Sequence, residues 1–231
     1  MIQWTDDDLV RVVTIDRPAR RNALTPDGLD ELERAVTTAD TPVVYVHGAG
    51  EAFCAGADLD VVVDLDDPAA FARHGQQVAD AIAAAEAAVV AGIDGAARGG
   101  GVELALACDL RIATPNATFA ETGVKLGLFG AWGGTVRLPA IVGYGNAADL
   151  TLSGRTVDAS EAHRMGLVSR VVDDPRAVAD ELAATNTQAL GVVKERLFDD
   201  ADPEAKLERE AAGFAHLHRE HLDQLRALRA D

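Results

Sequence analysis

Cysteine, serine and long apolar runs are scarce in this chain of 231 residues. Two cysteines, Cys54 and Cys108, are too few for a disulfide framework or a metal cluster, and they favour a reducing, cytoplasmic setting. None of the three serines stands in a G-x-S-x-G sequence, which argues against a serine nucleophile. The longest near-apolar stretch, Ala81 to Ile93, is too short to cross a bilayer, and the N-terminus shows no secretory signal pattern.

Lysine is also scarce, and the charge is strongly one-sided. The chain carries 38 acidic residues against 21 Lys and Arg, of which only 3 are Lys, for a formal net charge of -17. A field of this sign repels the phosphate backbone, so nucleic-acid binding is not expected. Because the Debye length falls to about 3 Å at 1 M salt, such self-repulsion is tolerable in concentrated salt. We therefore expect a protein adapted to high salt; an ordinary acidic bacterial protein is the alternative.

Strand and helix patterns alternate along the first two thirds of the chain. Branched residues predict strands at Val10–Ile15, Val43–Val46, Val89–Ile93 and Leu110–Ala113. Residues 61–75 have an irregular pattern, whereas Ala79–Ala88 has a helical one. The sequence after Asp158 favours helix, and prolines predict helix starts at Pro26, Pro175 and Pro203. The alternation predicts an α/β fold.

Two glycine-rich turns are the most informative local features. Gly48–Phe53 and Gly143–Ala148 fit dinucleotide loops only in part, so a nicotinamide cofactor is not expected. The turns at Ala55–Asp58 and Gly99–Gly101 consist mostly of small residues, which let a ligand approach the backbone closely. Gly99–Gly101 also precedes a predicted helix, whose first N–H groups have no partner inside the helix. If N–H groups of both turns converge, they form an oxyanion hole; two ordinary tight turns are the alternative.

Six short sequence blocks follow one another between roughly residues 10 and 172. They are Arg17-Pro18 with Asn22-Ala23-Leu24, Ala52–Leu59, Gly95 with Gly99–Ala105, Ala107–Ala113, Lys125–Leu128 with Gly133-Gly134-Thr135, and Ala159–Val168. Together they resemble the enoyl-CoA hydratase/isomerase (crotonase) family. The combination is specific to that family, although no single block is.

The resemblance implies a crotonase-type spiral of ββα repeats with the CoA thioester site in residues 1–172. A C-terminal helical region that assists trimer formation would follow in residues 173–231. The implied ligand is an acyl-CoA thioester, with coenzyme A as part of the substrate and no separate cofactor or metal. A homotrimer or hexamer is expected, and neither nucleic acid nor a membrane is expected as a partner.

Motif matching also assigns backbone groups to the thioester. The N–H groups of Ala57 and Gly100 are expected to polarise the thioester carbonyl, and each such donor is typically worth about 2.7–4 kcal/mol in the transition state. Backbone contacts to coenzyme A are expected at Ala23, Ala55 and Leu59. A local basic cluster, either a contact to the CoA phosphates or a solvated surface cluster, consists of Arg17, Arg20 and Arg21.

The acid/base residues match the family only in part. Hydratases of the family use two glutamates around one water, and Glu103 matches the first of them. An unpaired carboxylate among Val102, Leu104 and Ala105 is costly, and burial raises its pKa toward a catalytic range; a structural helix cap is the alternative. The second position is Gly123, which has no side chain; Glu121 could reach the same water, or could be an acid at the surface or one step behind the reacting groups.

Three functions follow from this pattern. Enoyl-CoA hydratase is the main reading, because the overall pattern resembles it. Double-bond isomerase comes next, since one carboxylate and an oxyanion hole suffice to move a proton between carbons. A non-catalytic acyl-CoA-binding or assembly protein is the alternative from another class, because the second glutamate is missing.

Overall fold

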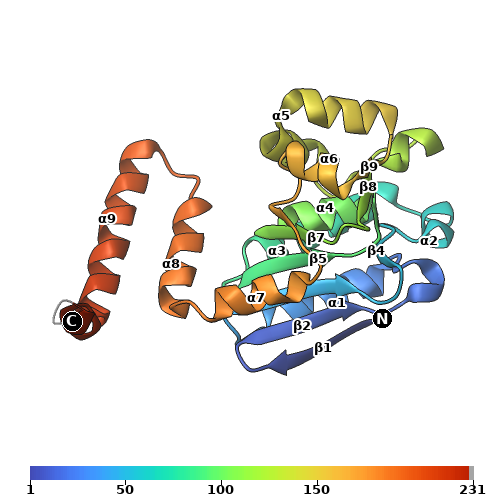
Figure 1. The fold of residues 1–231 in the computed structure, drawn as a ribbon. Helices are drawn as coiled ribbons and strands as arrows, with labels where there is room; N and C mark the ends of the chain where they lie inside the picture. Colours follow the sequence, from blue (N-terminus) through green and yellow to red (C-terminus); the bar gives the residue numbers. More distant parts are fainter. Residues whose placement is uncertain (229–231) are drawn as a thin grey trace. The chain divides into compact units, whose positions relative to one another are not determined.

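The structure is a computed structural model that describes residues 1–228. Its larger sheet has the strand order β1-β2-β3-β5-β7-β10 (Figure 1). These strands are Ile2–Asp7, Val10–Ile15, Val43–Gly48, Ala88–Ile93, Leu110–Ala113 and Arg170–Val171. β1 pairs with β2 in the antiparallel sense, and every later neighbour is parallel. β3 and β5 are near-continuous runs of buried residues, as parallel strands covered on both faces require.

A smaller sheet has the order β4-β6-β8-β9, with the strands Ala52–Cys54, Ala96–Arg98, Thr118–Ala120 and Val157–Asp158. The chain visits the two sheets alternately: β3 is followed by β4, β5 by β6 and β7 by β8. Each pair leads into helix, so the architecture is a spiral of ββα repeats. The predicted α/β class and spiral are confirmed.

Helices connect the repeats and enclose the core. Within residues 1–183 they are α1 Pro26–Thr37, α2 Leu59–Val63, α3 Pro68–Ala83, α4 Gly100–Ala107, α5 Gly134–Ser153, α6 Ala159–Arg164 and α7 Pro175–Ala183, with 3-10 turns η1 Pro18–Arg20 and η2 Thr122–Leu126. The central helix is α4, which lies beneath α5 and α6 in Figure 1 and is buried from Gly101 to Ala107. Glu103 is therefore a charged residue inside the core.

The predicted strands are confirmed, and the helix starts at the three prolines are also confirmed. The irregular pattern predicted for residues 61–75 is wrong, because the end of α2 and the first half of α3 lie there. Asp67 caps α3 by accepting a hydrogen bond from the Ala70 N–H at 2.9 Å, and Pro68 occupies the first turn. The helix predicted for Ala79–Ala88 ends at Ala83, since Ala88 already begins the buried strand β5.

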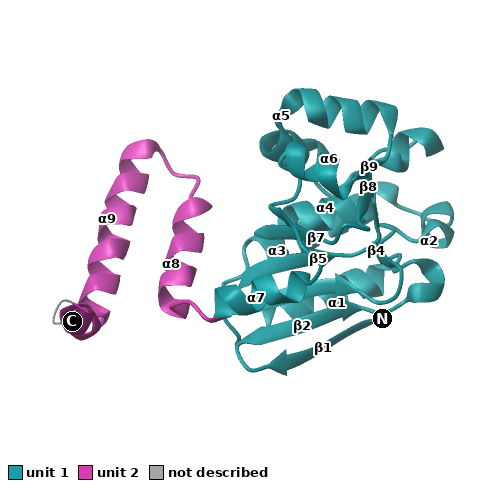
Figure 2. Cartoon of the chain, in the orientation of Figure 1, with its two compact units in different colours: residues 1–183 teal, residues 184–231 magenta. Residues whose placement is uncertain are grey.

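The chain divides into two compact units, residues 1–183 and the segment from Ala184 onward (Figure 2). The second unit contains α8 Thr187–Leu197, α9 Pro203–Glu220 and α10 Leu222–Leu228, of which α8 and α9 pack against each other. Large apolar side chains of this unit are exposed at Leu197, Phe198, Leu207, Phe214, Leu225 and Leu228. The functional division predicted at residue 172 stays a prediction.

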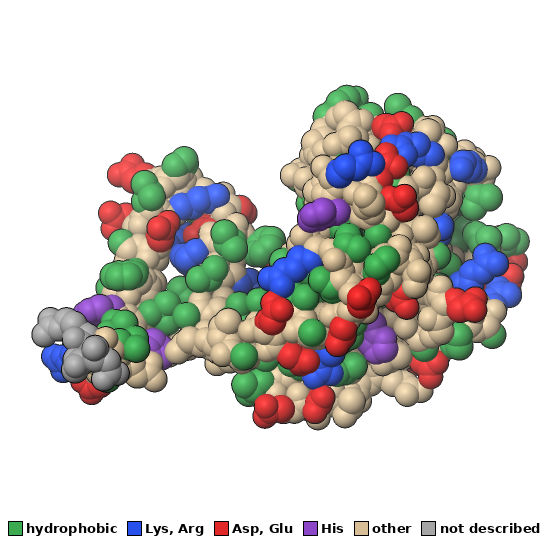
Figure 3. All heavy atoms as spheres, in the orientation of Figure 1, with side chains coloured by type: hydrophobic (Ala, Val, Ile, Leu, Met, Phe, Trp, Pro, Cys, Tyr) green, Lys and Arg blue, Asp and Glu red, His purple; other side chains and the backbone are tan. Residues whose placement is uncertain are grey.

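Charged side chains cover the surface without one dominant acidic patch on the face drawn in Figure 3. The adaptation to high salt stays a prediction. Among residues 1–228, no helix has both the length and the apolar character needed to cross a membrane.

Candidate active site

An apolar cavity with a volume of about 380 Å³ brings the two glycine-rich turns together. Ala57 lines it from one turn, Gly100 from the other, and Glu103 from the first turn of α4. Most of the remaining wall is apolar and includes Leu59, Val62, Leu65, Phe71, Phe129 and Trp132. Glu103 is the one ionisable residue among the described residues of this lining.

The two turns approach each other because glycine stands at the contact. Gly56 has a φ of +84°, and a Cβ there would lie 2.8 Å from the Gly100 nitrogen. A short bridge holds the first turn: the Leu24 N–H donates to the Gly56 carbonyl at 2.8 Å, and the Asp58 N–H donates to the Leu24 carbonyl at 2.9 Å. The N–H of Ala57, which lies between these bonds, is thereby left outside the bridge.

Two backbone donors thus remain available at one wall of the cavity. Gly100 is the first residue of α4, so its N–H has no partner inside the helix. Within residues 1–228, the Ala57 N–H donates no backbone hydrogen bond. Small residues and a helix N-terminus make this wall suited to a developing negative charge.

Glu103 is 1% exposed, and its carboxylate is held by backbone donors alone. Its Oε1 accepts hydrogen bonds from the N–H groups of Trp132 at 2.8 Å and Gly134 at 2.7 Å. Burial raises the pKa of this carboxyl, against the opposing effect of those two N–H groups and of Arg137. The result is an oriented carboxyl at the cavity wall with a raised proton affinity, as a general acid/base needs.

Glu121 follows β8 and lies beside Glu103. A Cβ placed on Gly130 would be 2.8 Å from Oε2 of Glu121 and 3.0 Å from Oε1 of Glu103, so both carboxyls border the same point. Glu121 is 5% exposed, which excludes the surface acid considered above. Glu121 is not among the described residues that line the cavity, whereas Glu103 is.

The position expected for a second glutamate has no room for one. Gly123 lines the cavity, but a Cβ there would lie 2.8 Å from the Phe129 Cα and 3.0 Å from its nitrogen. The Leu128 N–H donates to the Gly123 carbonyl at 2.9 Å and holds this backbone in place. The chain after η2 therefore fills the space into which a side chain at residue 123 would extend.

Trp132 closes one end of the cavity. Its indole is wedged between two glycines: a Cβ would lie 2.1 Å from the ring at Gly75 and 2.3 Å from it at Gly100. Phe71 meets it edge to face, with ring centroids 5.8 Å apart. Trp132 thus both fills the core and shapes the cavity, whereas Phe129 lines the cavity and is 64% exposed.

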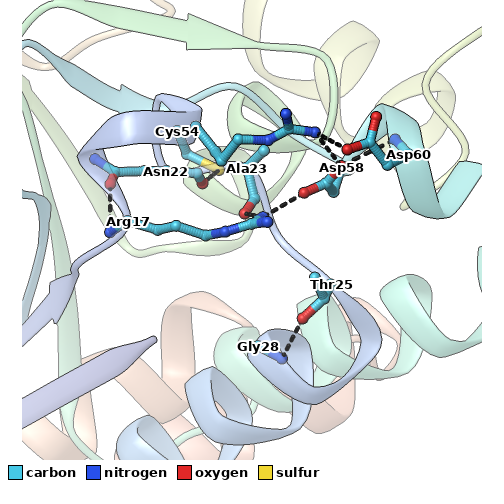
Figure 4. A network of polar contacts seen from close by, with 9 residues as sticks. Arg17, Asn22, Ala23, Thr25, Gly28, Cys54, Asp58 and Asp60 are labelled. Atoms are coloured by element: carbon cyan, nitrogen blue, oxygen red, sulfur yellow. Dashed lines mark hydrogen bonds and ion pairs between the residues drawn. The ribbon is translucent and has the colours of Figure 1, made fainter.

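A third buried acidic side chain, Asp58, follows Ala57 directly and supports the turn (Figure 4). It pairs with the guanidinium group of Arg17 and, at 3.1 Å, with that of Arg20, and it caps α2 by accepting from the Asp60 N–H at 2.9 Å. Burial alone would raise the pKa of Asp58, but Arg17, Arg20 and the Asp60 N–H outweigh it and lower the pKa to about 2. Arg17 also donates to the Ala23 carbonyl at 3.0 Å.

Of the other residues predicted to contact CoA, some line the cavity and others lie beside it. Ala55 and Leu59 line the cavity, whereas Ala23 is buried next to it with its carbonyl already bound by Arg17. Arg21 is exposed, has a φ of +50°, and makes no ion pair within the described residues. A phosphate contact by the arginines stays a prediction, in which Arg21 is the guanidinium not committed to a carboxylate.

Neither cysteine lines the cavity. Both are buried, and burial raises the pKa of the Cys54 thiol to about 12; this thiol donates to the Asn22 carbonyl at 3.2 Å and accepts from the Gly56 N–H at 3.4 Å. Within residues 1–228, no group of three His, Cys, Asp or Glu side chains is arranged to hold a metal ion.

Sequence reasoning missed Asp58 and the backbone donors to Glu103. Asp58 carried a local signal, because an aspartate before an apolar helical segment is a typical N-cap. The N–H groups of Trp132 and Gly134 carried none, since their meeting with Glu103 is a contact between α4 and the start of α5.

Comparison with known proteins agrees with this geometry. A family model described as enoyl-CoA hydratase/isomerase matches residues 6–226. The chain is 36% identical over 225 residues to a crotonyl-CoA hydratase of Syntrophomonas wolfei, covering 90% of this chain and 86% of that protein. It is 37% identical over 214 residues to a "probable enoyl-CoA hydratase" of Mycobacterium bovis, covering 87% and 83%. A crystal structure of enoyl-CoA hydratase from Bacillus anthracis superposes with a TM-score of 0.91 at 30% identity, covering 99% and 96%.

Proposed function

The chain belongs to the enoyl-CoA hydratase/isomerase family, and we propose on this premise that it adds water across the double bond of a 2-enoyl-CoA thioester. The observation that carries the proposal is the meeting of two available backbone donors and one oriented carboxylate in a single apolar cavity. These are the groups that a reaction through a thioester enolate needs.

The thioester carbonyl accepts hydrogen bonds from the N–H groups of Ala57 and Gly100. As water adds to the β-carbon, electrons move onto this carbonyl oxygen and an enolate forms. The two donors and the N-terminus of α4 stabilise the new negative charge, which is larger in the transition state than in the bound substrate.

Glu103 carries the proton of the reaction. Its carboxylate accepts a proton from the attacking water while the water oxygen forms its bond to the β-carbon. The protonated Glu103 then gives this proton to the α-carbon, the enolate collapses, and the carboxylate is restored. One carboxylate therefore balances the overall addition of water.

The rest of the substrate follows from the walls of the cavity. The apolar side chains of Leu65, Phe71 and Trp132 suit an acyl chain. Coenzyme A is proposed to run along Ala23, Ala55 and Leu59, with its phosphates toward Arg21 and the exposed side of Arg20.

Gly123 favours a second candidate, double-bond isomerisation. An isomerase needs one carboxylate that removes a proton from one carbon and returns it to another, and Glu103 meets that need. The closed space at Gly123 is the observation that keeps this candidate beside hydration.

The assembly is proposed to be a homotrimer or hexamer of this chain. The exposed apolar side chains of α8 and α9, among them Phe198 and Phe214, would be buried by such an association. Sedimentation of the purified protein tests this, and a monomer at micromolar concentration contradicts it.

The test of function is turnover of two thioesters by the purified chain. Loss of the conjugated double bond of crotonyl-CoA, with 3-hydroxybutyryl-CoA as product, supports hydration. Conversion of a 3-enoyl-CoA into its 2-enoyl isomer without hydration of crotonyl-CoA supports the isomerase. Tight binding of crotonyl-CoA with no turnover of either thioester contradicts both and favours the binding-protein alternative.

A further inference from the structure

Glu121 has no part in the reaction proposed above, yet its carboxyl is a costly group for the fold. Both of its oxygens are shielded from solvent, and neither makes a hydrogen bond within the described residues. An isolated ionised carboxylate in such a place is strongly unfavourable, so the group is held neutral. A buried polar group left in this state calls for a functional explanation.

Glu121 lies beside the catalytic carboxylate because two backbone elements meet. The Gly99 N–H donates to the Ala120 carbonyl at 3.0 Å, which joins the end of β8 to the start of α4. The two carboxyls then face Gly130, where even a methyl group would be 2.8 Å from one and 3.0 Å from the other. Glycine at residue 130 is what allows the chain to cover both.

The hydrogen-bond donors around the pair are unevenly distributed. Glu103 accepts hydrogen bonds from the N–H groups of Trp132 and Gly134, and Glu121 accepts none within the described residues. Hydrogen-bond donors stabilise an ionised carboxylate more than a protonated carboxyl group. The negative charge of the pair is thereby assigned to Glu103 and the proton to Glu121.

We infer that Glu121 is a positioning residue that stays protonated beside Glu103, so that the pair holds one negative charge and that charge lies on the carboxylate at the cavity. This inference rests on the proposed function of Glu103. Two adjacent carboxyls in a dry site do not ionise together, and the donors decide which one keeps its proton. Glu121 acts through Glu103 and not on the substrate.

The charge state of Glu121 matters because the enolate is itself an anion. If Glu121 ionised, a second negative charge would stand next to the forming enolate and would also hold a proton on Glu103. Both effects slow the reaction. Burial, with the neighbouring Glu103 carboxylate, raises the pKa of Glu121 to about 9, so the neutral form persists through the physiological range.

Other charged groups around the pair do not compensate Glu121. Arg137 of α5 acts on Glu103, where it opposes the rise in pKa that burial causes. Arg98 of β6 donates to the Thr118 carbonyl at 2.6 Å, and the Lys125 side chain lies along Gly154. Glu103 is therefore the charged neighbour that governs Glu121 in the described part of the chain.

The experiment compares the wild type with Glu121→Gln, which keeps the shape of the protonated side chain and cannot ionise. The probe is crotonyl-CoA, or the 3-enoyl-CoA if that is the substrate, with kcat/KM measured from pH 6 to 10.5. We expect the wild-type value to fall above about pH 9, and Glu121→Gln to stay within about threefold of wild type at pH 7 and to lack that fall. The exposed Glu86→Gln is the control, with a wild-type profile.

Two other outcomes for Glu121→Gln would contradict the inference. An unchanged alkaline fall in Glu121→Gln shows that another group titrates. A loss above about 100-fold at pH 7 in a folded variant shows that Glu121 itself transfers the proton. A wild type that turns over neither thioester contradicts the proposed function instead, which keeps the two failures distinct.

Thermal unfolding provides a readout that does not depend on catalysis. A carboxyl whose pKa is about 9 in the folded state and near 4.5 in the unfolded state makes stability fall as the pH rises between these values. We expect the wild-type Tm to fall more steeply than that of Glu121→Gln from pH 5 to 9, with Glu86→Gln following the wild type. Parallel curves for wild type and Glu121→Gln would overturn the inference.

Discussion

Two regions of the molecule bury carboxyl groups, and they treat them in opposite ways. Asp58 meets two guanidinium groups and a backbone N–H, and its pKa is lowered to about 2. Glu103 meets two backbone N–H groups, Glu121 meets none, and burial raises the pKa of both. The first region stabilises charge and the second leaves charge poorly compensated.

The contrast separates carboxyl groups that support the backbone from carboxyl groups that take part in the proposed chemistry. Asp58 adjoins Ala57 and is fully partnered, so its charge fixes the turn that presents a backbone donor. Neither Glu103 nor Glu121 has a guanidinium partner like those of Asp58, so Glu103 can exchange a proton while Glu121 keeps its own. A carboxylate that must gain and lose a proton cannot be held by arginines as Asp58 is.

The largest expected effect comes from removing the proton carrier. Glu103→Gln is expected to lower kcat by about 10²–10⁴-fold, because amide nitrogen cannot accept the water proton. The free energy of unfolding should stay equal or rise, since a buried carboxylate with a raised pKa is removed. Turnover of crotonyl-CoA, CoA binding and urea unfolding measure the three quantities. Full activity would remove Glu103 from the mechanism.

Removing the fully partnered carboxylate should act on stability. Asp58→Asn is expected to lower the free energy of unfolding at pH 7 by about 1.5–3 kcal/mol, the usual worth of hydrogen bonds to a charged group. Because its folded pKa of about 2 lies below the ordinary value of 3.8, the contribution is present above pH 4 and lost as the pH falls toward 2. Urea unfolding between pH 2 and 7 tests this.

Asp60→Asn is the matched control for that variant. Asp60 pairs with the same Arg20, but its side chain is 80% exposed. Exposed pairs contribute about 0–1 kcal/mol, so little change is expected. Equal losses in both variants, or a loss for Asp58→Asn that is independent of pH, would show that burial does not distinguish the two carboxylates.

Salt should have the smallest effect on the stability difference between wild type and Asp58→Asn. The net charge of -17 predicts that KCl raises the Tm of the wild type, because screening weakens the repulsion among exposed acids. The difference between wild type and Asp58→Asn should change by less than about 0.5 kcal/mol between 0.1 and 2 M KCl, since buried pairs are screened little. Tm unchanged by salt would contradict the predicted adaptation.

Much of the fold was predictable because its signals are local. Branched runs marked the strands, and prolines marked three helix starts. The prediction failed at residues 61–75, where the exposed acids Asp64, Asp66 and Asp67 separate the short helix α2 from the alanine-rich helix α3. Small side chains give a weak apolar pattern, so the tertiary contacts of α3 decide that this segment is helical.

The sequence by itself determined the two glycine turns, the Glu103 helix and the missing side chain at Gly123, since each is written in adjacent residues. Only the tertiary structure decided that Ala57 and Gly100 line one cavity, that Phe129 fills the space beyond Gly123, and that the carboxyls of Glu121 and Glu103 both border Gly130. These are contacts between elements distant in sequence, and the proton affinity of a carboxyl depends on such neighbours and on burial.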